Sequence, residues 1–182
     1  MPEPTDSLIT NTKRRMKSNA GATEEIWKEM VYNKDITNDK VIDAYKVWAE
    51  AYDKDFAIVH PNRAEHMAVY LDELVTQYGM KKENLKILDV AAGTGLVGEE
   101  LKKRGFNPFN ITALDLCPDM LNVARKKNVY GKLVQSSFGS TMPKGMTAKS
   151  YDCVIMCGGF AAGHIPLSRY EHVIYHNIWL YG

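Results

Sequence analysis

The spacing of apolar residues divides the chain into a helical first part and an alternating second part. In residues 39–53 and 62–78, apolar side chains recur every three or four positions, which predicts two amphipathic helices. A shorter helix is expected ahead of them, because Thr23 suits an N-cap and two glutamates follow it in the first turn. Gly79 stands where a left-handed residue is expected to end the third helix.

From Lys86 onward, short apolar runs alternate with helical segments. The predicted strands lie at residues 87–91, 111–115, 133–135 and 151–157. Helices are expected to begin at Leu96 and Pro118, between these strands. Such alternation implies parallel β-α-β units with helices on both faces of the sheet. The sequence therefore predicts an α/β fold of the Rossmann-like, doubly wound kind, with a mainly parallel sheet and N-terminal helices.

Three regions are expected along the chain: a disordered polar arm at residues 1–22, N-terminal helices at 23–80 and an α/β core at 81–182. Few residues follow Cys157, enough for one further strand, which is expected at residues 172–181. The fourth strand is then expected to have an unpaired edge and an uncovered apolar face. Both features favour self-association through the exposed sheet edge.

Composition narrows the classes of partner. The formal net charge is +1, so no overall field attracts nucleic acid or an anionic membrane. No apolar run reaches the roughly 20 residues needed to span a bilayer. The three cysteines do not make an even disulfide set, which fits a reducing compartment. We therefore expect a cytoplasmic protein with no nucleic-acid partner and no membrane association.

The candidate chemistry lies where the first predicted strand ends, at Gly93, Thr94 and Gly95. In a doubly wound sheet, ligands bind at the carboxyl ends of the strands. Glycines let the backbone approach a ligand closely, and the N–H groups of the following helix face a negative group. Together with Gly98, the turn also fits a dinucleotide fingerprint. The glycines alone therefore do not identify the cofactor.

Two acidic residues near the turn help to identify the cofactor. Asp89 lies in an otherwise apolar strand, where a carboxylate needs a cationic or hydrogen-bonding partner. S-adenosylmethionine offers an ammonium and a sulfonium, whereas this carboxylate would repel the pyrophosphate of a dinucleotide. Alternatively, Asp89 binds backbone N–H groups of the turn. Asp115 ends the second strand, where it suits the ribose hydroxyls of an adenosine or, alternatively, caps the helix after Pro118.

Residues 87–98 closely resemble motif I of the class I S-adenosylmethionine-dependent methyltransferases, and residues 114–121 resemble their acidic second-strand loop. Residues 45–53 are similar to the helix that covers the cofactor in many small-substrate members. With residues 163–166, this helix most resembles the Williams–Beuren syndrome chromosome-region methyltransferase-like proteins. The resemblance implies a seven-stranded sheet, S-adenosylmethionine as cofactor and methyl transfer to a small-molecule acceptor.

The resemblance also implies a set of site residues. The expected cofactor-binding residues are Tyr45, Tyr52, Asp89, Ala91, Gly93, Thr94, Gly95, Asp115, Leu116, Ser136, Ser137 and Cys157. Ser136 and Ser137 replace the acid that often meets the adenine amino group, and Lys46 stands where an aspartate is usual. His164, just past the fourth strand, is the candidate general base; the alternative is a structural or exposed histidine.

Other functions remain open from the sequence. The chain is too short for the whole sheet of the family, so we expect a truncated product, and a catalytically inactive binding or regulatory fragment is one rival. An NAD-dependent oxidoreductase is another, against which Asp89 argues. His172 and His176 have the spacing of metal ligands on a helix, but no third ligand accompanies them, so no metal site is expected.

Overall fold

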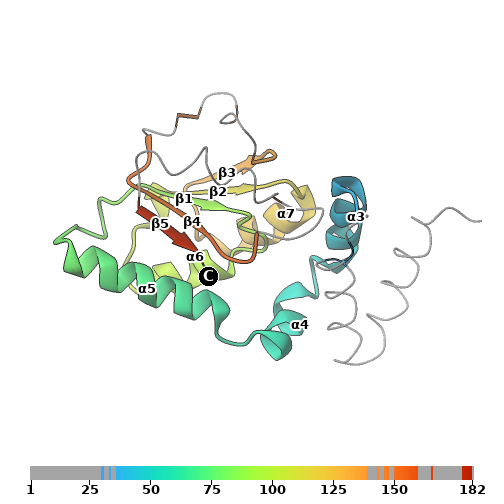
Figure 1. Cartoon of the computed structure of the whole chain (residues 1–182), viewed down its shortest axis with the longest axis horizontal. Coiled ribbons are helices and arrows are strands. Elements are labelled where there is room, and N and C mark those ends of the chain that lie inside the picture. Colours follow the sequence, from blue (N-terminus) through green and yellow to red (C-terminus); the bar gives the residue numbers. More distant parts are fainter. Residues whose placement is uncertain are drawn as a thin grey trace, which may run out of the picture.

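The computed structural model of the chain describes residues 30, 33, 36–138, 143, 146–147, 150–159, 165 and 178–181. The predicted arm at residues 1–22 lies outside this part, as do His172 and His176. The described chain begins with helices and continues into a β-sheet with further helices packed against it (Figure 1).

Three of the helices precede the sheet: α3 (Asn38–Trp48), α4 (Tyr52–Val59) and α5 (Arg63–Gln77). The helix expected at residues 62–78 is confirmed as α5, and Gly79 follows it with a φ of 63°. The inward side of α5 buries Met67, Ala68, Leu71 and Val75. Burial of one such large apolar side chain contributes roughly 1.5–3 kcal/mol.

The single helix expected at residues 39–53 is wrong, because the chain turns between Trp48 and Tyr52. Trp48 is buried, and its indole N–H donates a hydrogen bond to Asp55 Oδ2 across the turn, at 2.9 Å. The Tyr52 ring packs edge-on against Trp48, with centroids 4.8 Å apart. These contacts favour two short helices over one continuous helix, although the residues of the turn itself are good helix formers.

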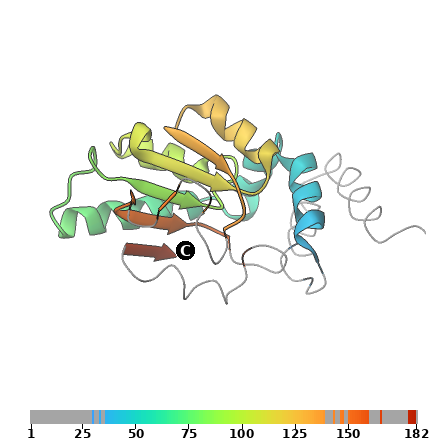
Figure 2. The ribbon, with the colours of Figure 1, turned by 90° about the horizontal axis from the view of Figure 1, so that it is seen from above.

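The sheet consists of five parallel strands in the order β3-β2-β1-β4-β5 (Figure 2). Their bounds are β1 (Ile87–Val90), β2 (Ile111–Asp115), β3 (Lys132–Gln135), β4 (Cys153–Met156) and β5 (Ile178–Tyr181). The first strand along the chain lies in the centre, and the order runs outward from it in both directions. This topology confirms the predicted Rossmann-like, parallel fold. It also places the carboxyl ends of β1, β2 and β4 side by side.

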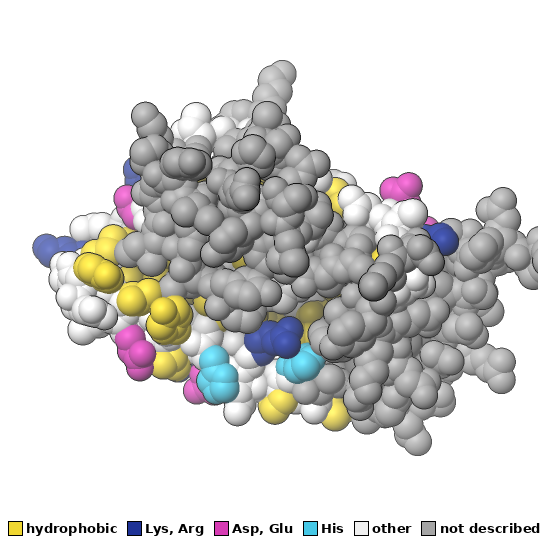
Figure 3. Space-filling view, viewed as in Figure 1, with side chains coloured by type: hydrophobic (Ala, Val, Ile, Leu, Met, Phe, Trp, Pro, Cys, Tyr) yellow, Lys and Arg dark blue, Asp and Glu magenta, His cyan; other side chains and the backbone are white. Residues whose placement is uncertain are grey.

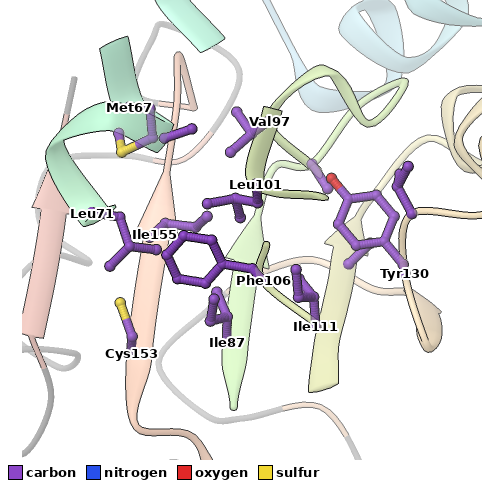
Figure 4. Packing of buried hydrophobic residues seen from close by; sticks show 14 of the residues in the cluster. Met67, Leu71, Ile87, Val97, Leu101, Phe106, Ile111, Tyr130, Cys153 and Ile155 are labelled. Atoms are coloured by element: carbon purple, nitrogen blue, oxygen red, sulfur yellow. The ribbon is translucent and has the colours of Figure 1, made fainter. Parts of the chain in front are cut away.

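Two helices lie between the early strands: α6 (Leu96–Lys103) and α7 (Pro118–Lys127), with a short 3-10 helix η1 (Pro108–Asn110) before β2. Side chains of α5, α6 and α7 share one core on one face of the sheet (Figure 4). Phe138, Met146 and Tyr151 pack on the other face. The expected helices on both faces are therefore not found in the described residues, where segments without helix cover the second face.

The fourth strand is not an edge strand. β5 pairs with it in parallel, with Cys153 opposite Ile178 and Met156 opposite Tyr181. Its apolar face is also covered, because Val154 and Met156 are buried in the second core. The expectation of an unpaired and uncovered fourth strand is therefore wrong, since one further strand satisfies its backbone groups.

Candidate functional site

The turn after β1 adopts left-handed backbone conformations at three positions. The φ angles are 55° at Ala91, 55° at Gly93 and 88° at Gly95, which immediately precedes α6. Glycine takes this conformation without strain, whereas an alanine pays roughly 1–2 kcal/mol for it. Ala91 is thus a strained residue at the carboxyl end of the central strand, where the surrounding structure must hold it in place.

Two N–H groups of this turn already have partners within the protein. Gly93 N–H donates to Asp115 Oδ2 at 2.8 Å, and Gly95 N–H donates to the Ala92 carbonyl at 3.0 Å. In a dinucleotide site, turn N–H groups such as these face the pyrophosphate. This turn is held by a carboxylate instead, which disfavours a second anion at the same place.

Asp115 joins the end of β2 to the glycine turn. Besides Gly93 N–H, its carboxylate accepts the N–H of Cys117 at 2.8 Å, the position just before α7. Burial raises the pKa of Asp115, and the backbone donors at Cys117, Gly93 and Leu116 oppose that shift. The capping bond at Cys117 is thus present. Each carboxylate oxygen has room for a second donor, so the capping bond does not exclude ribose binding.

Asp89 finds its partner within the core, in a residue that the sequence did not reveal. Tyr130 donates its hydroxyl hydrogen to Asp89 Oδ2 at 2.7 Å, and Asp89 is 1% exposed. Burial raises the pKa of Asp89 to about 7, against the effect of the Tyr130 hydrogen bond. Asp89 is not among the residues that line the cleft described below. It therefore lies beneath the turn, and its partner is neither the turn N–H groups nor a surface group.

One residue in the sequence pointed to a bulky neighbour such as Tyr130. This residue is Gly98, the third glycine of the fingerprint. A Cβ added at Gly98 would lie 2.6 Å from the Tyr130 ring, and one added at Gly95 would lie 3.0 Å from it. Figure 4 shows the Tyr130 ring at the border of the core, close to α6. Gly98 therefore admits a tyrosine that satisfies the buried Asp89.

A cleft opens over the carboxyl ends of β1 and β4, beneath the N-terminal helices. Its lining residues are Tyr45, Tyr52, Phe56, Arg63, Ala64, Ala91, Ala92, Gly93, Thr94, Leu96, Val97, Cys157 and Gly158. Tyr45 and Tyr52 come from α3 and α4, and their ring centroids are 6.0 Å apart. Burial raises the pKa of both tyrosines, so both remain protonated. The cleft thus brings together the glycine turn and two of the predicted covering-helix residues.

Three cleft residues of the N-terminal helices were not predicted from the sequence as site residues: Phe56, Arg63 and Ala64. Phe56 stacks on Tyr52, with centroids 5.0 Å apart, and Arg63 lies over the Phe56 ring at 5.8 Å. Phe56 belongs to α4 and Arg63 is the first residue of α5. The misplaced helix boundary hid Phe56, because a helix ending at residue 53 leaves it in a loop. Arg63 lies in the helix that was expected at residues 62–78, but nothing in the sequence indicated that it lines the cleft.

A series of hydrogen bonds and ion pairs connects α4 to the glycine turn. Thr94 is buried and donates its hydroxyl hydrogen to Asp53 Oδ1 at 2.5 Å. Lys127 Nζ, at the end of α7, donates to Asp53 Oδ2 at 2.5 Å and to Glu99 Oε2 of α6 at 2.6 Å. Asp53 and Lys127 therefore link four separate segments of the chain: the glycine turn, α4, α6 and α7.

The remaining predicted residues lie around the cleft or outside the described chain. Leu116, Ser136 and Ser137 do not line the cleft; they follow β2 and β3, and Ser136 N–H donates to the Asp115 carbonyl at 3.0 Å. Cys157 lines the cleft, and burial raises the pKa of its thiol to about 11. The candidate base His164 lies outside the described residues.

In the part of the chain that the structure describes, no group of three or more histidine, cysteine or acidic side chains gathers in a way that would hold a metal ion. No described helix combines the length and apolar character required to cross a membrane.

Known proteins with similar sequence are methyltransferases. Residues 87–175 match the family model described as a methyltransferase domain. The chain is 34% identical to methyltransferase-like protein 27 of Homo sapiens over 122 residues, which cover 67% of this chain and 47% of the human protein. The chain spans about half the length of the curated relatives it matches.

Solved structures with a similar fold are methyltransferases as well. An S-adenosylmethionine-dependent methyltransferase from Clostridium acetobutylicum aligns with a TM-score of 0.54 at 20% identity, over 75% of this chain and 56% of that one. CalS10, an amino pentose methyltransferase from Micromonospora echinaspora, aligns with a TM-score of 0.50 at 21% identity, over 68% of this chain and 48% of that one. These likenesses confirm the Rossmann-like fold, and with the family match they support a class I methyltransferase.

Proposed function

We propose that this chain is the cofactor-binding part of a class I methyltransferase, which binds S-adenosylmethionine in the cleft over β1 and β4 and methylates a small molecule. One observation carries the choice of cofactor: the turn offers its Gly93 N–H to Asp115 rather than to a ligand. The Asp115 carboxylate beside the turn favours a cofactor that carries a sulfonium and an ammonium over one that carries a pyrophosphate.

The charges and the strand order suggest how the cofactor lies. Asp115, at the end of β2, binds the ribose hydroxyls, and Leu116, Ser136 and Ser137 lie on the adenine side. The methionine arm crosses Gly93 toward Cys157, at the end of β4. Tyr45 and Tyr52 face the sulfonium, where a cation–π contact contributes about 0.5–2 kcal/mol.

The chain's own residues contribute alignment and the exclusion of water. The cofactor supplies a methyl group bound to a sulfonium, which departs as a neutral thioether when the acceptor forms its bond to the methyl carbon. Holding the reactants in line supplies roughly 7–11 kcal/mol of the acceleration. The half-buried Tyr45 and Tyr52 and the buried Phe56 keep water from this part of the cleft. In this proposal His164 takes the proton that the acceptor loses.

A small-molecule acceptor fits the covering helices. The covering-helix residues in the cleft are largely aromatic, which suits a compact organic acceptor. Among the structural neighbours, CalS10 is an amino pentose methyltransferase. The finer resemblance to the Williams–Beuren syndrome region proteins, and a cytoplasmic location, belong to the same proposal. The location rests on Cys117, Cys153 and Cys157, which form no disulfide.

A methyl-transfer assay tests the activity. The chain is incubated with S-adenosylmethionine labelled on its methyl group and with a cell extract separated into small-molecule and protein fractions. We expect label in the small-molecule fraction, and at least a tenfold lower rate for Asp115→Ala, which loses roughly 1.5–3 kcal/mol of charge-assisted hydrogen bonding. Label in the protein fraction would contradict the acceptor class. Cofactor binding without transfer to either fraction would select the inactive binding fragment instead.

A further inference from the structure

Lys127 lies outside the cleft, yet it contacts the helix that covers the cleft. It is the last residue of α7 and is not among the lining residues. Its Nζ donates to Asp53 Oδ2 of α4 at 2.5 Å and to Glu99 Oε2 of α6 at 2.6 Å. The Lys127 side chain is only 15% exposed, so solvent screens these ion pairs less than pairs at the surface.

The helix α4 depends on contacts of this kind. It has eight residues, too few for a stable helix in isolation, and no side chain caps its N-terminus. Among the described residues, the ion pair of Asp53 with Lys127 is the only one that α4 makes. Near the junction of α4 and α5, Figure 3 shows a basic side chain beside two histidines, with no acidic side chain between them. Lys127 therefore provides the ionic contact between α4 and the α/β core.

Asp53 lies between two aromatic residues of α4 that line the cleft. Tyr52 precedes it in the chain, and Phe56 follows about one helical turn later. The other carboxylate oxygen of Asp53 accepts the hydroxyl hydrogen of Thr94, which lines the cleft from the glycine turn. A movement of α4 away from the turn would therefore open the cleft, and the Asp53–Lys127 pair opposes that movement.

Lys127 also neutralises two carboxylates that belong to different helices. Asp53 and Glu99 contact the same nitrogen atom, so the two acids are close neighbours. Without the lysine, two like charges would face each other across the gap between α4 and α6 and repel. Lys127 thus replaces a repulsion between these helices with an attraction, which apolar packing alone does not do.

We propose that Lys127 is a positioning residue for cofactor binding, which acts through Asp53 to hold α4 closed over the cleft and so sets the rate of cofactor exchange. The inference rests on the proposed function. Closure of such an element commonly limits how fast a ligand enters and leaves. Because Lys127 does not line the cleft, its loss destabilises the closed form equally with and without ligand. It should therefore change both rates far more than the affinity.

The test compares two neighbouring lysines of α7. Titration with S-adenosylhomocysteine, followed by NMR line-shape analysis, gives the association rate, the dissociation rate and Kd for each chain. The variants are Lys127→Met and the double variant Lys127→Met with Glu99→Gln, which also removes the repelling charge. Lys126→Met is the matched control, because Lys126 pairs with Glu50 at 2.8 Å in solvent, with side chains 66% and 78% exposed. Circular dichroism verifies that each variant is folded.

We expect Lys127→Met to raise both rates roughly tenfold and to change Kd less than about threefold, since one partner of a half-buried ion pair is lost. The double variant should recover most of the wild-type rates, and Lys126→Met should keep them within about twofold. In the wild-type chain, added salt should accelerate exchange, and the double variant should lack that dependence.

Three results would overturn the inference. They are unchanged rates in folded Lys127→Met, the same acceleration in Lys126→Met, and a weaker Kd with an unchanged association rate. If Lys127→Met does not fold, an equal salt dependence in the wild-type chain and the double variant has the same meaning. If the folded wild-type chain does not bind S-adenosylhomocysteine, the proposed function itself fails.

Discussion

At the residue scale, the acids around the glycine turn differ in what they contact and therefore in what they do. Asp115 holds the Gly93 N–H at 2.8 Å, and Asp53 holds the Thr94 hydroxyl. Asp89 lies deeper and is satisfied by Tyr130. Two of the three carboxylates thus hold the turn directly. The third, Asp89, lies beneath the turn, and its protonation depends on pH.

The ionisation of Asp89 should make stability depend on pH. Burial raises its pKa to about 7, so the folded chain keeps a proton that the unfolded chain loses from about pH 4 upward. The free energy of unfolding should therefore fall as the pH rises from about 4 to 7, by at most about 1.4 kcal/mol per pH unit. Below that range both states are protonated, and above it the effect is constant. Urea unfolding of the wild-type chain and of Asp89→Asn at several pH values measures the difference.

The Tyr130→Phe variant serves as the control for this prediction. The Tyr130 hydroxyl stabilises the Asp89 carboxylate, so its removal should raise the pKa of Asp89 and extend the pH-dependent range upward. Parallel pH profiles for the wild-type chain and Asp89→Asn would contradict the assigned ionisation.

The sequence predicted the residues of the turn but not their partners. Gly93, Gly95 and Asp115 follow from the end of a strand and the start of a helix, which are local patterns. Tyr130 lies 41 positions from Asp89, and no local pattern indicates that contact. A buried carboxylate requires a partner, but which residue provides it depends on the packing of distant elements.

At the element scale, the break between α3 and α4 matters most for the cleft. Periodicity predicted one helix because the residues near Ala49 are good helix formers and the apolar spacing continues through them. The turn arises instead from the Trp48 bond to Asp55, which lies beyond the expected end of the helix at residue 53. The turn between α3 and α4 places α4 next to the glycine turn, where Asp53 contacts Thr94.

Replacing Asp53 should therefore loosen α4. Asp53→Ala leaves the buried Thr94 hydroxyl without its acceptor and Lys127 with Glu99 alone, so we expect a loss of about 1–3 kcal/mol in the free energy of unfolding. Hydrogen exchange of the α4 amides should accelerate more than that of α5. Glu50→Ala is the matched control, because Glu50 also pairs with a lysine of α7 but does so in solvent. Equal changes in the two variants would argue against a specific fastening by Asp53.

At the scale of the whole molecule, the sequence predicted that the strands pair in parallel. It did not predict which segments cover the sheet. Alternating strands and helices implied parallel pairing, and the observed order places β1 in the centre with Asp115 and Cys157 on either side of its end. The pairing of β5 with β4 depends on a contact across more than 20 residues, which periodicity does not address. The same holds for the second face, which Phe138 and Met146 cover without a regular helix.

The central claim is that this arrangement selects S-adenosylmethionine, and calorimetric titration tests it most directly. The folded chain is titrated with S-adenosylhomocysteine and, separately, with NADH, alongside Asp115→Ala. We predict binding of S-adenosylhomocysteine on the order of micromolar Kd, no binding of NADH, and an affinity roughly 10- to 100-fold weaker for Asp115→Ala. NADH binding as tight as that of S-adenosylhomocysteine, or an affinity for S-adenosylhomocysteine unchanged by Asp115→Ala, would contradict the account.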